Sequence, residues 1–296
     1  MASRQRFSQR HPFFFGFALI TLAVALIIGA MAFFQFWMGD GLGFRRAKLG
    51  VVYVQGTIAD ARRVNRWIED LRQNPDIQGV LVRIDSPGGV VAPAQEMHAA
   101  VRRLAETKPV VVSMGSVAAS GGYYVACGAD TIVANPGTIT GSIGVKANVP
   151  NVRELMDKIG LREETIVSGE FKDAGSPTKP LTPEERAYFQ KLVDDLFSQF
   201  VDAVAKGRGM KEKEVRRLAD GRAYTGQQAL NLGLVDELGD RAKAVDILRN
   251  MCDITRQVDF VEGPEERSRL WSLLLGEIGW AQVREALSGS HALFEY

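Results

Sequence analysis

Residues 110–126 carry the sequence VVVSMGSVAASGGYYVA, in which β-branched residues are followed by a glycine-rich turn and a second apolar stretch. The pattern predicts a buried strand at Val110–Met114 and a helix that follows the turn and runs through Ala126. The same order occurs upstream, where a strand at Gly79–Ile84 ends in Asp85-Ser86-Pro87-Gly88-Gly89 and a helix follows at Ala92–Leu104. Strands that alternate with helices predict an α/β fold with a mostly parallel sheet. Because open α/β sheets bind ligands where their strands end, the two glycine-rich turns are the expected place for a functional site.

The remaining apolar segments fit the same pattern of alternating strands and helices. A polar loop from Gly169 to Pro183 leads into a helix that Thr182 caps and that runs toward Lys206. The other expected elements are strands at Leu49–Val54, Thr131–Ala134 and Glu164–Val167, and helices at Val64–Leu71 and Ala242–Met251.

An apolar segment without a charged residue extends from Phe13 to Met38. As a helix it would be about 39 Å long, which exceeds a ~30 Å hydrocarbon core. Arginines at positions 4, 6 and 10 precede it, so the positive-inside rule places the preceding tail in the cytoplasm and the following residues outside. A cleaved signal peptide is the alternative, with Ala30-Met31-Ala32 as a weak cleavage site. The apolar run continues past that site, which favours an uncleaved transmembrane helix.

Composition excludes several classes of protein. The chain has 296 residues, of which 36 are basic and 35 acidic, so its net charge is +1, whereas nucleic-acid-binding domains usually have a basic excess. Two cysteines cannot build a disulfide framework, and three scattered histidines offer no local metal-binding motif. We therefore expect no nucleic-acid partner, no metal and no other cofactor. Cys127 and Cys252 are expected to remain unpaired, as small buried apolar side chains.

Ser120 is the candidate nucleophile. It lies at the expected start of a helix, where free N–H groups and the positive end of the helix dipole can stabilise an oxyanion. A serine that only caps the helix is the alternative. Alanine at position 118 departs from the G-x-S-x-G pattern of α/β-hydrolases.

A serine nucleophile needs a base. A lysine can replace histidine if burial lowers its pKa from about 10.4 toward neutrality. Lys172 in the polar loop is one candidate, although most lysines are solvated surface charges.

Five motifs follow one another along the chain. They are Asp85-Ser86-Pro87-Gly88-Gly89, Ala119-Ser120-Gly121-Gly122-Tyr123-Tyr124, Thr140-Gly141-Ser142-Ile143-Gly144-Val145, Ser168-Gly169 with Lys172, and Gly221-Arg222 with Tyr224-Thr225-Gly226 and Gly233-Leu234-Val235-Asp236. Together they resemble the signal peptide peptidase A family, membrane-anchored serine–lysine peptidases of the bacterial envelope. The resemblance spans roughly residues 49–255, and the length matches the short, single-repeat form of the family.

The resemblance implies a fold like that of Clp protease and crotonases, with repeated β-β-α units around a mostly parallel sheet. It implies Ser120 as the nucleophile, Lys172 as the general base and Ser142 as the hydroxyl that orients the lysine amine. The oxyanion hole would combine the Gly121 N–H with an N–H of the Gly88-Gly89 turn. Short family members form rings in which one subunit's lysine completes a neighbour's serine, so a homo-oligomeric ring is expected.

Three further residues match family positions, and we interpret them as packing residues: Arg222, Tyr224 and Thr225.

The resemblance and the anchor together predict the substrate and the location. We expect short or unfolded apolar peptides, such as cleaved signal-peptide remnants, to be hydrolysed at the outer, periplasmic face of the bacterial cytoplasmic membrane. The apolar residues beside the turns, Val90, Val91 and Met114, are the expected lining of the pocket.

Three alternatives remain. A serine–histidine–aspartate peptidase of the Clp type is disfavoured because no histidine occurs between Ser120 and His291. A crotonase-type acyl-CoA enzyme fits neither the Ser120/Lys172 pair nor the anchor. A non-catalytic envelope scaffold would have kept the motifs without the activity.

We expect the chain to divide into a cytoplasmic tail at 1–12, a transmembrane anchor at 13–38, a linker at 39–48, a peptidase domain at 49–255 and a C-terminal helical tail at 256–296. The tail contains apolar residues from Leu270 to Trp280 near several arginines. That pattern fits a membrane-surface helix, or alternatively a helix that packs on the core or on another subunit.

Overall fold

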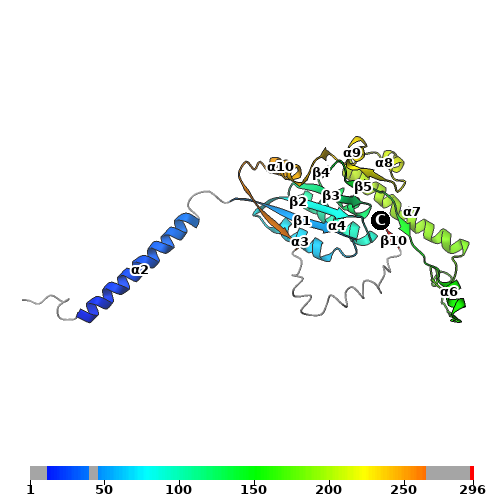
Figure 1. The fold of residues 1–296 in the computed structure, drawn as a ribbon, viewed down its shortest axis with the longest axis horizontal. Helices are drawn as coiled ribbons and strands as arrows, with labels where there is room; N and C mark the ends of the chain where they lie inside the picture. Colours follow the sequence, from blue (N-terminus) through cyan, green and yellow to red (C-terminus); the bar gives the residue numbers. More distant parts are fainter. Residues whose placement is uncertain (1–11, 40–45, 265–293) are drawn as a thin grey trace, which may run out of the picture. The chain divides into compact units, whose positions relative to one another are not determined.

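The computed structural model describes residues 12–39, 46–264 and 294–296. It divides into two compact units, Met1–Arg46 and Ala47–Tyr296. The first contains the continuous helix α2 (Pro12–Gly39), within which Gly16–Phe34 is apolar and long enough to cross a membrane (Figure 1). The predicted N-terminal apolar helix is therefore present with nearly the expected bounds.

Within the described residues, one eight-stranded sheet forms the centre of the second unit (Figure 1). The strand order is β7-β5-β3-β2-β1-β9, and β4 pairs with both β3 and β8. Every pairing is parallel except that of β5 with β7, which confirms the predicted α/β fold. The strands are β1 (Ala47–Gln55), β2 (Ile77–Ser86), β3 (Val110–Ala119), β4 (Thr131–Ala134), β5 (Ile139–Gly141), β7 (Ala223–Thr225), β8 (Glu237–Leu238) and β9 (Val258–Gly263).

Helices cover both faces of this sheet. On one face Leu248 of α10 belongs to a small core that includes Leu49 and Val111; on the other, α3, α4, α5 and α7 form a larger core. Alternate side chains of a strand point to opposite faces of the sheet. Because both faces are buried here, the strands appear in the sequence as uninterrupted apolar runs. The helices are α3 (Arg62–Gln73), α4 (Val91–Ala105), α5 (Gly121–Ala126), α6 (Arg153–Lys158), α7 (Pro183–Arg208), α8 (Glu212–Leu218), α9 (Gly226–Asn231) and α10 (Arg241–Met251).

The predicted start of α7 is confirmed in detail. The Thr182 side chain accepts a hydrogen bond from the Glu185 N–H at 3.2 Å, and the Glu185 carboxylate accepts one from the Thr182 N–H at 3.1 Å. This reciprocal pair is a capping box, which satisfies two N–H groups at the start of the helix. The helix ends at Arg208, where Gly209 adopts a left-handed φ of 61°.

Two expectations about secondary structure are wrong. The predicted strand at 164–167 is an exposed irregular segment, in which Ile166 is 94 % exposed and no described strand lies alongside to pair with it. The predicted helical tail at 256–296 begins instead with β9, which pairs in parallel with β1 over Val258–Gly263. The sheet therefore extends past residue 255.

The last described residues also form a strand rather than a helix. Strand β10 (Phe294–Glu295) pairs antiparallel with β6 (Lys146–Ala147) in a separate two-stranded sheet. The apolar stretch near residues 270–280, which we expected to be helical, lies outside the described residues.

Candidate active site

Ser120 lies at the junction of β3 and α5. Its φ of 55° is in the left-handed region, which costs a non-glycine residue about 1–3 kcal/mol. Two backbone hydrogen bonds hold this conformation, because the Ser120 N–H donates to the Gly141 carbonyl at 2.8 Å and the Ser120 carbonyl accepts from the Tyr124 N–H at 2.9 Å. In the described part of the chain the hydroxyl makes no capping hydrogen bond with α5. This geometry disfavours a capping role and leaves the hydroxyl free for chemistry.

The glycine turn after β2 approaches Ser120 closely. A Cβ atom on Gly88 would lie 2.7 Å from the Gly121 nitrogen and 3.0 Å from the Ser120 Cβ, and the Gly88 φ of 102° favours glycine. The Gly88 N–H already donates to Ser86 Oγ at 3.1 Å. The Gly89 nitrogen lies 3.3 Å from the position that a Cβ on Gly121 would take. Gly88, Gly89 and Gly121 therefore approach one another closely beside Ser120.

A cavity of about 660 Å³ opens beside Ser120. Ser142, Gly88 and Gly89 line it with Ser120, so the structure brings four of the predicted site residues together. The expected apolar lining was wrong, because Val91 and Met114 are buried in the core and Val90 contributes a backbone pairing with Glu295 instead. The remaining lining residues are Thr57, Pro87, Gly144, Val145, Lys146, Val193, Asp194, Phe197, Ala219, Asp220, Gly221, Glu295 and Tyr296.

Ser142 is held at the cavity by the loop before β7. Its φ is 52°, its N–H donates to the Arg222 carbonyl at 3.0 Å, and its hydroxyl donates to the Gly221 carbonyl at 3.3 Å. The Tyr224 ring packs against Gly141, which accepts the Ser120 N–H. The side chain of Thr225 caps α9, and Arg222 forms an ion pair with Asp220. The contact of Tyr224 fits the expected packing role, Thr225 caps a helix, and Arg222 is exposed rather than packed.

Lys172 lies on a different part of the domain. Its N–H donates to the Gly169 carbonyl at 3.0 Å in an exposed turn, and its side chain is exposed. It is not among the described residues that line the Ser120 cavity. The cavity thus brings Ser120 and Ser142 together but leaves Lys172 outside.

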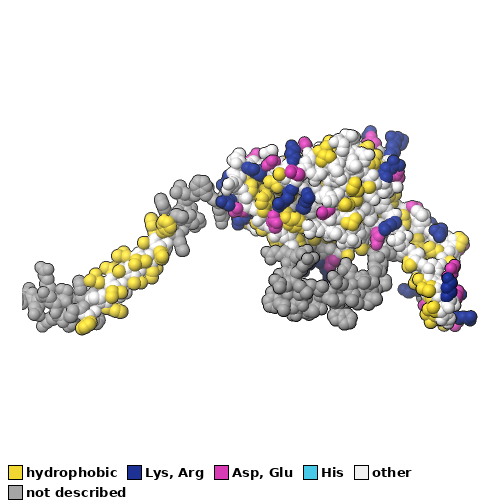
Figure 2. All heavy atoms as spheres, in the orientation of Figure 1, with side chains coloured by type: hydrophobic (Ala, Val, Ile, Leu, Met, Phe, Trp, Pro, Cys, Tyr) yellow, Lys and Arg dark blue, Asp and Glu magenta, His cyan; other side chains and the backbone are white. Residues whose placement is uncertain are grey.

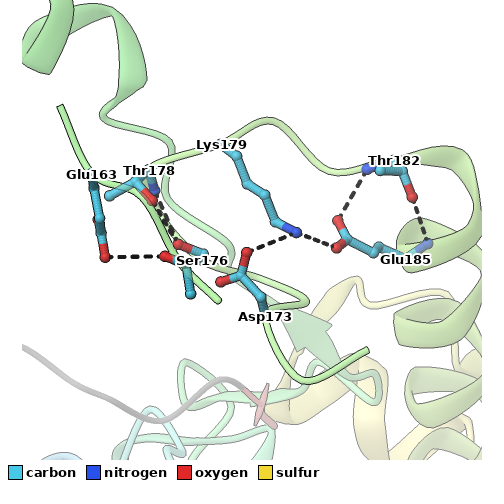
Figure 3. Close-up of polar contacts among 8 residues, drawn as sticks. Glu163, Asp173, Ser176, Thr178, Lys179, Thr182 and Glu185 are labelled. Atoms are coloured by element: carbon cyan, nitrogen blue, oxygen red, sulfur yellow. Dashed lines mark hydrogen bonds and ion pairs between the residues drawn. The ribbon is translucent and has the colours of Figure 1, made fainter. Parts of the chain in front are cut away.

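The turn that carries Lys172 is fixed to α7 by an ion-pair network (Figure 3). The Lys179 ammonium lies 3.0 Å from the carboxylate of Asp173 and 2.8 Å from that of Glu185, the residue that completes the capping box. The hydrogen bond from Lys179 holds the pKa of Glu185 below its ordinary value of 4.5. Glu185 therefore remains ionised at neutral pH, and the pair is lost only as the pH falls through that lowered pKa.

Sequence analysis missed several residues of the cavity, among them Lys146, Glu295 and Tyr296. The Lys146 ammonium lies 3.1 Å from the Glu295 carboxylate, and Tyr296 is 6 % exposed. The segment at residues 294–296 is too short to show a periodicity. Its partners, Lys146 and the turn at Gly89 and Val90, lie about 150 and 200 positions away in the chain, so no local pattern could reveal these contacts.

Other candidate catalytic groups lie apart from this cavity. The His98 Nδ1 atom lies 2.8 Å from the Tyr124 carbonyl oxygen, and burial lowers the pKa of the imidazole. His98 is not among the described lining residues of the Ser120 cavity, which disfavours it as the base.

The two cysteines are not part of the cavity among its described lining residues. Burial raises the pKa of the Cys127 thiol to about 12, and Cys252 Sγ contacts the Gln78 carbonyl oxygen at 3.4 Å. Among the described residues no group of three His, Cys, Asp or Glu could hold a metal ion.

Comparisons with known proteins identify the family of the chain. The sequence profile of peptidase family S49 matches residues 102–255. The chain is 44 % identical over 201 residues to a putative protease of Synechocystis, covering 67 % of this chain and 72 % of the relative. It is 35 % identical over 241 residues to a putative protease of Methanocaldococcus jannaschii, covering 81 % and 74 %. It is 34 % identical over 227 residues to a putative signal peptide peptidase SppA of Enterococcus faecium, covering 72 % and 66 %.

Proposed function

The chain belongs to peptidase family S49, the family of the signal peptide peptidase A proteins, and from that premise we propose how this serine peptidase works. Ser120 is the nucleophile, Lys172 is the general base, and the substrates are short or unfolded apolar peptides such as signal-peptide remnants. The observation that carries the proposal is the strained turn at Ser120, which lines one cavity with Gly88 and Gly89 and is followed directly by Gly121.

The reaction is an acyl transfer to Ser120 followed by hydrolysis. Ser120 Oγ attacks the peptide carbonyl carbon while a neutral lysine amine takes the hydroxyl proton. The Gly89 and Gly121 N–H groups stabilise the oxyanion that forms. The C–N bond then breaks, and the lysine ammonium gives the proton to the leaving amine. Water releases the acyl group by the same steps in reverse, which restores Ser120.

A second copy of the chain supplies the lysine in this proposal. Lys172 does not line the cavity of its own chain. It directly follows the segment at residues 152–171, a projection that includes α6 and carries many exposed apolar side chains. Figure 2 shows hydrophobic side chains on the projection that carries α6. Exposed apolar patches of this kind favour contact with another protein surface, and most soluble oligomers are symmetric assemblies of identical chains. The exposed residues are Val152, Leu155, Ile159, Leu161, Ile166, Val167 and Phe171.

The anchor supports the proposed location and substrate. Helix α2 can cross a membrane by length and composition, and the arginines that precede it in sequence favour an orientation with the peptidase domain at the outer face. The anchor would keep the peptidase domain at the membrane from which signal-peptide remnants are released. A crotonase-type acyl-CoA enzyme does not explain the anchor, and a scaffold without activity would not form an acyl-enzyme at Ser120.

An acyl-enzyme at Ser120 would test the proposed nucleophile. The full chain in detergent is mixed with a p-nitrophenyl ester of an apolar peptide and quenched with acid. Mass spectrometry should find the peptidyl group on Ser120, and the ester should give a burst of nitrophenol equal to the number of active sites. Ser198→Ala, an exposed serine of α7, should be acylated like the wild type. Acylation of another residue, or none, would contradict the assignment.

Lys179→Met should lower kcat about 10- to 100-fold with little change in KM, because the turn that carries Lys172 loses its attachment to α7. Lys179→Arg keeps the positive charge and should restore most of the activity. Lys191→Met, at an exposed position of the same helix, is the control and should behave like the wild type. Equal kcat values for Lys179→Met and the control would show that this ion-pair network does not position the base.

A further inference from the structure

Two buried hydroxyl side chains lie close to the nucleophile, on the strands that flank β3 (Figure 1). Ser86 ends β2, Thr140 lies in β5, and both are 0 % exposed. Both pair through their backbones with Ala118 of β3, which lies two residues before Ser120. Because a buried polar group costs stability unless it is hydrogen-bonded, the partners of these two hydroxyls show what they hold in place.

Ser86 holds the glycine turn that follows β2. Its Oγ atom accepts a hydrogen bond from the Gly88 N–H at 3.1 Å. Ser86 also lies close to the helix that follows Ser120, because a Cβ atom on Gly122 would lie 2.8 Å from the Ser86 carbonyl oxygen and 3.4 Å from its Cβ. The hydrogen bond commits the Gly88 N–H to Ser86, so the Gly89 N–H is the donor of this turn that the proposed mechanism can use.

Thr140 holds the end of the strand that leads to Ser120. Its Oγ1 atom donates a hydrogen bond to the Ala118 carbonyl at 2.7 Å. The next residue, Gly141, accepts the Ser120 N–H at 2.8 Å, so the short strand β5 restrains both β3 and the backbone of Ser120. Ser120 needs such restraint, because a non-glycine residue keeps a left-handed φ only where its surroundings impose it.

We propose that Ser86 and Thr140 are positioning residues for the reaction at Ser120. Ser86 fixes the Gly88-Gly89 turn through the Gly88 N–H, and Thr140 fixes the end of β3 through the Ala118 carbonyl. The inference rests on the proposed function of Ser120. A displacement of about 1 Å at a reacting group can cost about 100-fold in rate, so these hydroxyls control catalysis without touching the substrate.

Removal of each hydroxyl tests the proposal, on the full chain in detergent with a fluorogenic peptide. Ser86→Ala and Thr140→Val should lower kcat about 10- to 100-fold and leave KM within twofold, because the reacting groups shift while the walls of the cavity remain. Thr140→Ser keeps the hydroxyl and should retain at least a third of the wild-type kcat. Ser86→Cys replaces the hydroxyl with a weaker acceptor and should lose kcat as Ser86→Ala does, so the test does not depend on one variant.

Two matched controls separate positioning from stability. Ser113→Ala and Thr138→Val remove hydroxyls that are equally buried, at 1 % exposed, and that form hydrogen bonds of 2.8 and 2.7 Å farther from Ser120 along β3. All four variants should show a lower Tm, because each loses a buried hydrogen bond. Only Ser86→Ala and Thr140→Val should lose kcat. An equal loss of kcat in the controls would overturn the positioning roles.

A transition-state analogue gives a readout that general destabilisation would not change. Ser120 Oγ adds to the carbonyl carbon of a peptide aldehyde, and the hydroxyl proton passes to the former carbonyl oxygen, so the adduct resembles the tetrahedral intermediate. The inhibition constant of the aldehyde should rise in Ser86→Ala by about the factor by which kcat/KM falls. That of the matching peptide alcohol, which forms no adduct, should stay within twofold. Equal changes for both inhibitors, or none, would contradict the role of Ser86.

The two proposals fail separately. If wild-type Ser120 forms no acyl-enzyme, the proposed function is wrong and the positioning roles fall with it. If Ser120 is acylated but Ser86→Ala and Thr140→Val keep the wild-type kcat, the positioning roles alone are wrong.

Discussion

Mixed oligomers of Ser120→Ala and Lys172→Met chains should hydrolyse peptides, although each variant alone should lose a factor of about 10³ or more in kcat/KM. A site built from the serine of one copy and the lysine of another can be complete only in a mixture. With equal amounts of the two chains and random assembly, about a quarter of the sites would hold both wild-type residues. A site within one chain would gain nothing from mixing, because no chain then carries both residues.

The experiment requires oligomers that contain both variants. Co-expression with two different affinity tags and purification on both tags in sequence would provide them, and size-exclusion chromatography with light scattering would give their mass. A mixture of Ser198→Ala and Lys191→Met chains, both altered at exposed positions of α7, should keep full activity. An inactive Ser120→Ala/Lys172→Met mixture of confirmed composition would argue that Lys172 is not shared between subunits.

The sheet could be predicted because its signals are local. The strand–turn–helix at residues 110–126 and the capping box of α7 each depend on residues within one or two turns of each other, and both are found in the structure. The strand expected at 164–167 was wrong because β-branched residues favour a strand only where a sheet edge is available to pair with.

The missed strands depend on partners far along the chain. Strand β9 has the sequence Val-Asp-Phe-Val-Glu-Gly, which is too short and too irregular to distinguish from a loop until β1 is placed beside it. Strand β10 is shorter still and is defined by pairing with Val90 and β6. Long-range pairing of this kind is a property of the tertiary fold, and periodicity within the segment cannot reveal it.

In the candidate site, too, some features could be predicted from the sequence and others could not. Ser120 was singled out by its place in a strand–turn–helix segment, and the glycines at 88, 89 and 121 by the family resemblance; the structure brings these residues together. The sequence could not indicate that Lys172 lies outside the cavity of its own chain, because spacing along the chain says nothing about which copy completes a site. The catalytic roles of all these residues remain predictions.

Gly88→Ala should reduce kcat/KM by about 10²–10³ or more while the chain still folds. The new Cβ would lie 2.7 Å from the Gly121 nitrogen, in the space where the oxyanion is proposed to bind, so the loss should appear in kcat rather than in KM. The substitution also imposes a non-glycine residue on a φ of 102°, which costs about 1–3 kcal/mol of stability.

A matched control separates the loss of oxyanion stabilisation from the loss of fold stability. Gly233→Ala carries the same kind of backbone penalty at a φ of 74°, but nothing lies within 4 Å of the added Cβ, and Gly233 does not line the cavity among the described residues. Both variants should show a lower Tm in thermal unfolding, and only Gly88→Ala should lose activity. If the two variants lost activity in proportion to their loss of Tm, general destabilisation would explain the defect, and the oxyanion hole would have to lie away from the turn at Gly88 and Gly89.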